Sequence, residues 1–581
     1  MWSFTKRVLA ATLGSLLALV LLVLILVGIA AGASMGSEEP TELSQDRYVL
    51  DIDLSAGLSE RGNHDPLVGL LNEEEKDKLG LHEWRLLLNQ AAKDPKIAAI
   101  ALDCGSFEGG WAQAKEFRDL LLSFKNSKKP IYAHSFMFSE AGLYIASAAT
   151  EVSVNPKGMV EFNGIAGQVV MYKGLLSKMG VDVQVFKVGT FKGAVEPFIA
   201  DSLSQPNRLQ IAQYLEGAYR FQLKEISESR SIPFDSLWAA AMAGDRPFPE
   251  QAKQLGLVDE VLYQVEIEQK WQKKLGAKSA LPRVSAPDYW NSFDHYAYNR
   301  QKIAVLYAEG DIIMGKGSDN IAHETFLKEI QKLIEDDAVK AVVLRINSPG
   351  GSSFASDLMA NELARLRKKK PLIVSVSNYS ASGGYYMSCA GDSIFAQPNC
   401  ITGSIGVFAL IPNSQKLFND YLGLKYETVE LGEGSVLFRP DRPLSSVQQK
   451  LMQQSVDRIY ADFTSWVAEG RSMPLDTVLS LAQGRVYTGT MAKELGLIDE
   501  FGGLDRALLA AQRMAKLKDY QLQEFPAEES LVDRLFAGEI ESKMATRFAK
   551  NWGLSMEQII DLKQIHRHLG VQSRLPWSMP N

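Results

Sequence analysis

The sequence repeats itself once, and this internal duplication restricts the possible folds more than any other feature. The segment 98–102 (AAIAL) recurs as 340–344 (KAVVL), and 252–260 (AKQLGLVDE) recurs as 492–500 (AKELGLIDE). Further blocks recur in the same order, at an offset of 240–242 residues. This period is much longer than the roughly 20–50 residues of solenoid repeats. We therefore expect two tandem domains of one kind.

Each copy alternates short aliphatic strands with amphipathic helices. A Lys-Pro pair opens a strand at 129–130 in the first copy and at 370–371 in the second. Such alternation is typical of stacked βαβ units, so the predicted fold class is α/β. The tail includes an amphipathic stretch at 528–552. The predicted domains are the N-terminus with an anchor at 1–45, the first repeat at 46–295, the second repeat at 296–520 and a helical tail at 521–581.

The N-terminal segment 8–33 contains no charged residue. As a helix it would be about 39 Å long, enough to span a hydrocarbon core of about 30 Å. Lys6 and Arg7 precede it, so the positive-inside rule places the N-terminus in the cytoplasm and the rest outside. A cleaved signal peptide is the alternative, since 31–33 (AGA) fits a cleavage site. We favour a retained transmembrane helix, because this apolar stretch is longer than the apolar region of a cleaved signal peptide, which has about 7–15 residues.

The composition excludes several classes of function. Lys and Arg number 62 against 69 Asp and Glu, a net charge of −7 that argues against a nucleic-acid partner. The three cysteines, Cys104, Cys389 and Cys400, are too few for a disulfide framework. The seven histidines lack the spacing of metal ligands. We expect neither a metal nor a cofactor.

The two copies differ at a position suited to catalysis. In the second copy a strand leads into Ala381-Ser382-Gly383-Gly384, whose small residues permit a sharp turn into a helix. A serine there exposes its hydroxyl, and the helix N-terminus directs backbone N–H groups toward an anion. This suits a nucleophile with an oxyanion hole. An N-cap serine fits the local motif equally well. The first copy has Glu140 at the matching position.

A serine nucleophile needs a base, and the histidines do not offer one. His323 is the only histidine between 310 and 517, and it falls on a predicted surface helix, which argues against a Ser-His-Asp triad. A lysine can serve if burial lowers its pKa. The best candidate is Lys192, in the mostly apolar stretch 188–198, which has no matching lysine in the second copy. Taken alone, Lys192 fits a surface lysine with a buried stem better.

Taken together, these motifs resemble bacterial signal peptide peptidase A of the long, duplicated type, a family of membrane-anchored serine proteases in the ClpP/crotonase superfamily. The resemblance implies two ClpP/crotonase-like domains and a Ser/Lys dyad, with Ser382 as nucleophile, Lys192 as general base and Ser404 orienting the lysine. The backbone N–H groups of Gly351 and Gly383 would form the oxyanion hole. The motifs that carry it are 191–197 (FKGAVEP), 347–351 (NSPGG), 381–385 (ASGGY) and 402–406 (TGSIG).

The resemblance also implies the substrates, the oligomeric state and the cellular location. The substrates would be remnant signal peptides released from preproteins, and the enzyme would be a homotetramer in the bacterial cytoplasmic membrane with its catalytic domains on the periplasmic side. Ser380 is a second serine in the turn, but the glycine pair after Ser382 and the repeat register favour Ser382. A crotonase-like acyl-CoA enzyme and an inactive peptide-binding scaffold remain as alternatives. Candidates for apolar subsites, or for the core, are Ile405, Val407, Phe408 and Leu410.

Overall fold

The structure is a computed structural model. Within the part of the chain that it describes, no helix is both long enough and apolar enough to cross a membrane. The predicted anchor at 8–33, apart from Gly14, and the predicted helix at 528–552 lie outside the described residues. The described residues are Gly14, 43–62, 78–244, 248–295, 298–317, 320–432, 435, 439–527 and 570–574.

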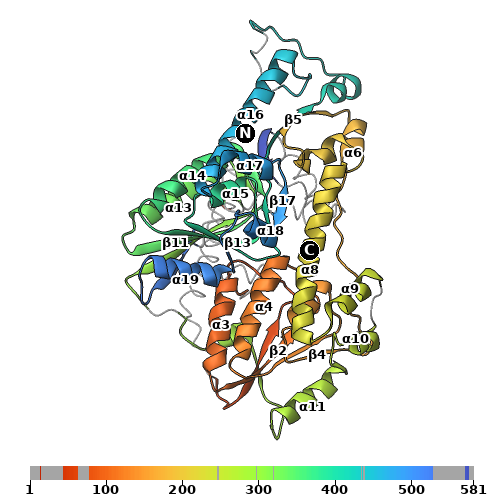
Figure 1. Ribbon diagram of the computed structural model, residues 1–581, viewed down its shortest axis with the longest axis vertical. Coiled ribbons are helices and arrows are strands. Elements are labelled where there is room, and N and C mark those ends of the chain that lie inside the picture. The colour runs from red at the N-terminus through yellow and green to blue at the C-terminus, as the bar shows by residue number, and fades with distance from the viewer. Residues whose placement is uncertain are drawn as a thin grey trace.

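The first repeat is built on a parallel six-stranded sheet in the order β6-β4-β3-β2-β1-β7 (Figure 1). Its strands are aliphatic on both faces because helices cover the sheet. The strands are β1 (Tyr48–Asp53), β2 (Ile97–Asp103), β3 (Ile131–Ser135), β4 (Glu151–Val154), β6 (Glu260–Val261) and β7 (Arg283–Ser285). The helices are α3 (Leu81–Lys93), α4 (Trp111–Lys125), α5 (Glu140–Ala146), α6 (Lys173–Lys178), α7 (Glu196–Ile199), α8 (Gln205–Arg230), α9 (Phe234–Met242), α10 (Pro249–Leu255), α11 (Gln264–Lys274) and α12 (Ala286–Trp290).

The second repeat contains the same sheet again. Its parallel strands follow the order β18-β14-β13-β11-β8-β19, which matches the first sheet strand for strand, and β15 and β17 extend it beside β13. The strands are β8 (Lys302–Glu309), β11 (Val339–Ser348), β13 (Leu372–Ala381), β14 (Ser393–Ala396), β15 (Ile401–Gly403), β17 (Val486–Thr488), β18 (Glu500–Phe501) and β19 (Gln521–Phe525). The helices are α13 (His323–Glu335), α14 (Ser353–Arg367), α15 (Gly383–Ser388), α16 (Ser446–Gly470), α17 (Leu475–Leu481), α18 (Gly489–Glu494) and α19 (Leu504–Met514). The prediction of a duplicated α/β unit is confirmed.

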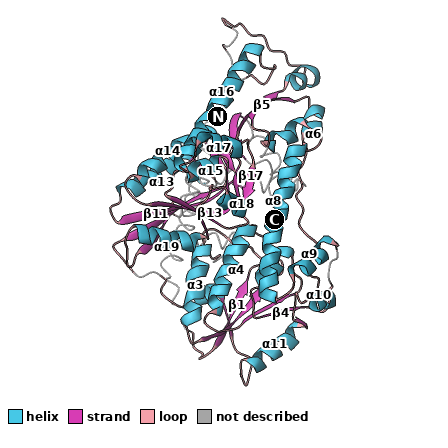
Figure 2. Ribbon diagram, in the orientation of Figure 1, coloured by secondary structure: helices cyan, strands magenta, loops and turns pink. Residues whose placement is uncertain are grey.

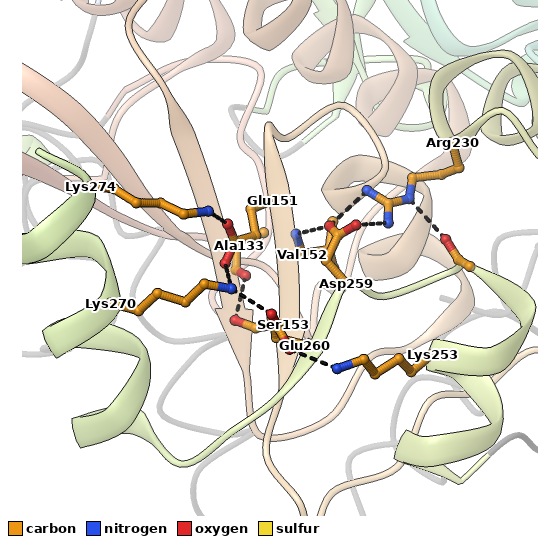
Figure 3. Close-up of polar contacts among 11 residues, drawn as sticks. Ala133, Glu151, Val152, Ser153, Arg230, Lys253, Asp259, Glu260, Lys270 and Lys274 are labelled. Carbon is orange, nitrogen blue, oxygen red and sulfur yellow. Dashed lines mark hydrogen bonds and ion pairs between the residues drawn. The ribbon is translucent and has the colours of Figure 1, made fainter.

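Side-chain contacts are duplicated along with the strands. In the first repeat, Arg230 forms a bidentate ion pair with Asp259, and Asp259 accepts a bond from the backbone N–H of Val152 (Figure 3). In the second repeat, Arg471 pairs with Asp499 in the same bidentate way. Asp499 likewise accepts a bond from the backbone N–H of Ile394 in β14. Each pair ties the end of a long helix to the sheet, so the recurring LGLxDE segment has a structural role in both copies.

A third sheet joins the two repeats. Its order is β10-β9-β12-β20-β16-β5. The edge strand β5 comes from the first repeat and lies beside α16 of the second (Figure 2). β5 runs antiparallel to β16, from Val188 opposite Val407 to Asp182 opposite Asn413. The strands are β5 (Asp182–Val188), β9 (Ile312–Ile313), β10 (Ile321–Ala322), β12 (Gly350–Ser352), β16 (Val407–Asn413) and β20 (Gly570–Arg574). This pairing carries the segment after β5 into the second repeat.

A buried ionic cluster also fastens the repeats together. Arg345 of β11 is 1% exposed and binds Glu60 at 2.6 Å and Glu116 of α4 at 2.8 Å. Asn378 of β13 accepts bonds from the backbone N–H groups of Ala112 and Gln113 at the start of α4. These contacts satisfy N–H groups that a helix start leaves without partners.

Candidate active site

The segment after β5 places Lys192 among residues of the second repeat. The backbone N–H of Phe191 donates to the carbonyl of Gln483 at 2.9 Å, and Gln210 of α8 donates to the Phe191 carbonyl at 2.8 Å. Lys192 itself is 0% exposed. The alternative of a surface lysine is therefore wrong, because the whole side chain lies inside the protein.

Two glycines of the second repeat shape the space around the lysine stem. A Cβ atom on Gly406 would lie 3.2 Å from Cδ of Lys192. A Cβ atom on Gly484 would lie 2.7 Å from Cβ of Lys192, closer than real contacts allow. Gly484 also has φ +73°, where an L side chain is strained. Both positions need glycine so that there is room for the side chain of Lys192 to extend toward the serines.

The amino group of Lys192 meets two serines. Its Nζ lies 2.7 Å from Oγ of Ser382, 3.0 Å from Oγ of Ser404 and 3.1 Å from the Ser404 carbonyl oxygen. Burial lowers the pKa of Lys192 well below its usual value. A neutral amine has two N–H donors and one lone pair. The two Ser404 oxygens can accept from the N–H groups, which leaves the lone pair for the Ser382 hydroxyl.

Both serines have backbone conformations that L residues rarely adopt. Ser382 has φ +56° and Ser404 has φ +52°. The Ser382 N–H donates to the Gly403 carbonyl and the Ser404 N–H to the Arg485 carbonyl, at 2.8 and 2.7 Å. Such strain costs about 1–3 kcal/mol and persists where surrounding contacts hold it. Ser382 precedes α15 without a side-chain capping bond, so the N-cap alternative does not describe its hydroxyl.

The two glycines predicted for the oxyanion hole lie on adjacent elements. Gly383 is the first residue of α15, and a Cβ there would lie 2.4 Å from Oγ of Ser356. Gly351 is in β12, where a Cβ would lie 2.1 Å from the Ile312 carbonyl oxygen. β12 packs against α15. The backbone of both glycines thus borders the space beside Ser382.

A pocket opens next to Gly383. Of the four predicted subsite residues only Val407 lines it, whereas Ile405, Phe408 and Leu410 are packed in hydrophobic cores. Sequence reasoning missed the acidic residues of its wall, Asp357 and Asp462, since no motif marks these helix positions. The lining residues are Ser353, Phe354, Ser356, Asp357, Gly383, Tyr386, Val407, Ile459, Asp462 and Phe463.

The first repeat closes the corresponding position with a carboxylate. Glu140 accepts bonds from the backbone N–H groups of Asn163 and Gly164 at 2.8 Å and from the hydroxyl of Tyr219 at 3.1 Å. Burial of this carboxyl raises the pKa of Glu140 to about 7. In the first repeat, a hydrogen-bonded carboxylate therefore takes the position that the Ser382 hydroxyl has in the second.

The other serine of the turn does not compete with this assignment. The Ser380 hydroxyl bonds to that of Ser388 at 2.7 Å, within β13 and α15. Among the described residues, no cluster of His, Cys, Asp and Glu side chains could hold a metal ion.

Comparison with known proteins identifies relatives along most of the chain. The model of peptidase family S49 matches residues 123–278 and 364–518. Protease 4 of Haemophilus influenzae is 32% identical over 522 residues, covering 85% of this chain and 83% of that protein. The chloroplastic serine protease SPPA of Arabidopsis thaliana is 32% identical over 441 residues, 74% of this chain and 64% of its own. A protein of Enterococcus faecium, provisionally named signal peptide peptidase SppA, is 36% identical over 234 residues, 39% of this chain and 67% of its own.

Proposed function

Because this chain belongs to peptidase family S49 and is a serine protease, we propose that Ser382 is its nucleophile and Lys192 its general base. The observation that carries the proposal is the distance of 2.7 Å between Lys192 Nζ and Ser382 Oγ in a fully buried setting. Desolvation lowers the pKa of the lysine and so favours the neutral amine, which is the form that accepts a proton. The family assignment favours hydrolysis over the acyl-CoA enzyme and the inactive scaffold.

The reaction proceeds through an acyl-enzyme. The lone pair of Lys192 Nζ takes the hydroxyl proton of Ser382 as Oγ attacks the carbonyl carbon of the scissile bond. The developing oxyanion accepts hydrogen bonds from the backbone N–H groups of Gly351 and Gly383. The C–N bond then breaks, and the ammonium of Lys192 gives its proton to the leaving amine. Water, deprotonated by the same lysine, hydrolyses the ester.

Ser404 orients the base. Its hydroxyl and carbonyl oxygens both lie within hydrogen-bond distance of Lys192 Nζ. With both N–H groups directed at Ser404, the remaining lone pair faces Ser382. Holding reacting groups in this geometry lowers the barrier without any further chemical step.

The proposed substrates are remnant signal peptides, bound at a membrane. Support comes from the name of the Enterococcus faecium relative and from the apolar segment 8–33 of this chain. Phe354, Val407 and Phe463 give the pocket beside Gly383 an apolar wall suited to such side chains. We extend the proposal to a single-pass anchor in the bacterial cytoplasmic membrane, periplasmic catalytic domains and a homotetramer of ClpP/crotonase-like subunits, on the resemblance of the sequence motifs.

The test compares full-length Ser382→Ala and Lys192→Met with the parent on an apolar fluorogenic peptide. We expect each change to lower kcat by about 10³-fold or more, because the two groups act as one unit. Ser380→Ala is the matched control and should keep most activity. A serine-reactive phosphonate should label the parent and not Ser382→Ala. Hydrolysis by Ser382→Ala at the parental rate would refute the dyad.

A further inference from the structure

Helix α8 of the first repeat lies against the strands of the second repeat that lead to the proposed serines. It packs beside β17 (Figure 1). Tyr214 and Ala218 of this helix form one apolar cluster with Ala381 of β13, Ile401 of β15 and Val486 of β17. The helix therefore has a fixed place on the second repeat, although it belongs to the first. A side chain on this face can hold parts of both repeats at once.

One side chain of α8, that of Gln210, bonds to both repeats. It is 1% exposed. Its Nε2 donates to the carbonyl oxygen of Phe191 at 2.8 Å and to Oδ1 of Asn207 at 2.7 Å. Its Oε1 accepts a bond from the backbone N–H of Val486 at 3.3 Å. Both N–H groups and the oxygen of the amide are thus engaged, which fixes the orientation of the amide.

The nitrogen of this amide holds the loop that carries the proposed base. The Phe191 carbonyl belongs to the peptide bond that joins Phe191 to Lys192, so Gln210 holds the main chain where the lysine side chain begins. Asn207 extends the contact, because its Nδ2 donates to Oε2 of Glu196 at 3.1 Å. Glu196 follows Lys192 at the start of α7. The loop is therefore held by α8 both before and after the lysine.

The oxygen of the same amide holds the strand to which both serines are fastened. Val486 lies opposite Gly403 in the antiparallel ladder of β17 and β15. The Gly403 carbonyl accepts from the Ser382 N–H at 2.8 Å. The carbonyl of Arg485, next to Val486, accepts from the Ser404 N–H at 2.7 Å. One side chain therefore connects the main chain at the lysine with the main chain at the two serines.

We propose that Gln210 is a positioning residue for the reaction: its amide keeps the loop that carries Lys192 at a set distance from the strand that holds Ser382 and Ser404. The inference rests on the proposed function, because this distance matters for catalysis only if Lys192 serves Ser382. Gln210 is not among the residues that line the pocket beside Gly383. It therefore acts on the reaction through the main chain that it binds, and not through the substrate.

The first experiment removes the amide from the full-length chain. In Gln210→Met the side chain keeps its length but has no N–H group. We expect kcat for an apolar fluorogenic peptide to fall at least about tenfold with KM close to the parental value, because the lysine is displaced and substrate binding is not. Parental kcat in this variant would overturn the inference. A higher KM with parental kcat would overturn it as well, because Gln210 would then act on substrate binding.

Gln222→Met is the matched control. Gln222 is also on α8 and also 1% exposed, and its Nε2 has no hydrogen-bond partner among the described residues. The control therefore loses an equally buried glutamine of the same helix without touching the lysine loop. It should keep the parental kcat and KM. An equal fall of kcat in both variants would show that any buried change in α8 has this effect, and would refute a specific role of Gln210.

Chemical labelling tests the position of Lys192 without relying on catalysis. In the Ser382→Ala background, acetic anhydride acetylates accessible amines, and mass spectrometry measures the rate at each lysine. We expect Gln210→Met to raise the rate at Lys192 at least about tenfold, because a loosened loop opens more often to the reagent. The rate at Lys115, a buried lysine of α4 that is 7% exposed, should not change. An equal rise at both lysines would mean that Gln210 supports the whole fold, and would overturn the inference.

The labelling result also separates this inference from the dyad. Faster labelling of Lys192 alone, together with parental hydrolysis by Ser382→Ala, would show that Gln210 positions the lysine although the dyad is wrong. Unchanged labelling of Lys192, together with an inactive Ser382→Ala, would refute the positioning role of Gln210 and leave the dyad intact.

Discussion

The Nζ atom of Lys192 lies 2.7 Å from the Oγ atom of Ser382, although 190 residues separate them in sequence. Desolvation is the cause of the lowered pKa of the lysine. The neutral form is thus the resting form over a wider pH range than for an ordinary lysine. This property leads directly to a pH dependence.

We predict that kcat/KM falls as the pH drops through the lowered pKa of Lys192, about tenfold per pH unit, because protonation removes the lone pair. Lys192→Arg should lose at least about 10³-fold at every pH, since a guanidinium stays protonated. A pH–rate profile of the parent and this variant checks both statements. A profile without an acidic limb would contradict the role of the lysine.

The same shift predicts the stability of Lys192→Met. Between the lowered pKa and the ordinary value of about 10.5, the unfolded chain binds one more proton than the folded chain. The free energy of unfolding of the parent therefore decreases as the pH falls through this window. Methionine has no such proton, so the variant should melt at a higher temperature than the parent at pH 7 while being inactive. Calorimetry at pH 7 and pH 10 measures the difference, which should shrink at the higher pH.

Gly484→Ala should lower kcat by about 10²-fold and also destabilise the protein, because alanine is strained at φ +73° and its methyl group would clash with Lys192. The added methyl would stand 2.7 Å from Cβ of Lys192 and displace the stem, and a shift of about 1 Å can cost about 10²-fold in rate. Gly244→Ala is the matched control: Gly244 has φ +74°, close to the +73° of Gly484, but nothing lies within 4 Å of its Cβ position. Steady-state kinetics and thermal melts of the two variants separate the steric effect from backbone strain. Equal activities would show that the glycine does not position the lysine.

Arg345→Met should destabilise the protein by about 3–5 kcal/mol, because it leaves Glu60 and Glu116 buried without their cation. Adding Glu60→Gln and Glu116→Gln should recover part of this loss. Lys173→Ala breaks the exposed pair with Asp201 and should cost less than about 1 kcal/mol. Denaturant unfolding compares the four proteins. A small effect of Arg345→Met would mean that the repeats hold together without the cluster.

Glu140→Gln should flatten the pH dependence of stability. The folded pKa of about 7 exceeds the ordinary value of 4.5, so the folded chain binds more protons between these values. The parent should then lose up to about 3 kcal/mol of stability as the pH rises from about 4.5 to 7. Glutamine does not titrate and should lack this component. Parallel slopes for both proteins over this range would show that the carboxyl of Glu140 titrates normally.

The internal repeat was enough to predict the duplicated α/β unit, whereas Ser382 and Lys192 were selected as nucleophile and base by the resemblance to the family. The repeat register supplied the comparison, and Glu140 and the unmatched lysine marked the asymmetry. The third sheet could not be predicted, because the pairing of β5 with β16 joins segments far apart in the chain and leaves no local pattern. The same holds for Arg345, whose partners lie in another repeat. Ile405, Phe408 and Leu410 pack in hydrophobic cores, the role that was favoured for each of the four candidates, and Val407 lines the pocket. The sequence could not single out Val407, because an apolar side chain in a strand shows the same pattern whether it faces a pocket or a core.

The division of the proposed dyad between the two repeats also determines when proteolysis can begin. The ribosome completes the lysine 190 residues before the serine. The lysine reaches its final surroundings only when β5 has paired with β16 and the loop around Gln483 has formed. A half-made chain therefore holds a base with no nucleophile. The newly made protein can therefore cleave other proteins only after both repeats have folded and packed together.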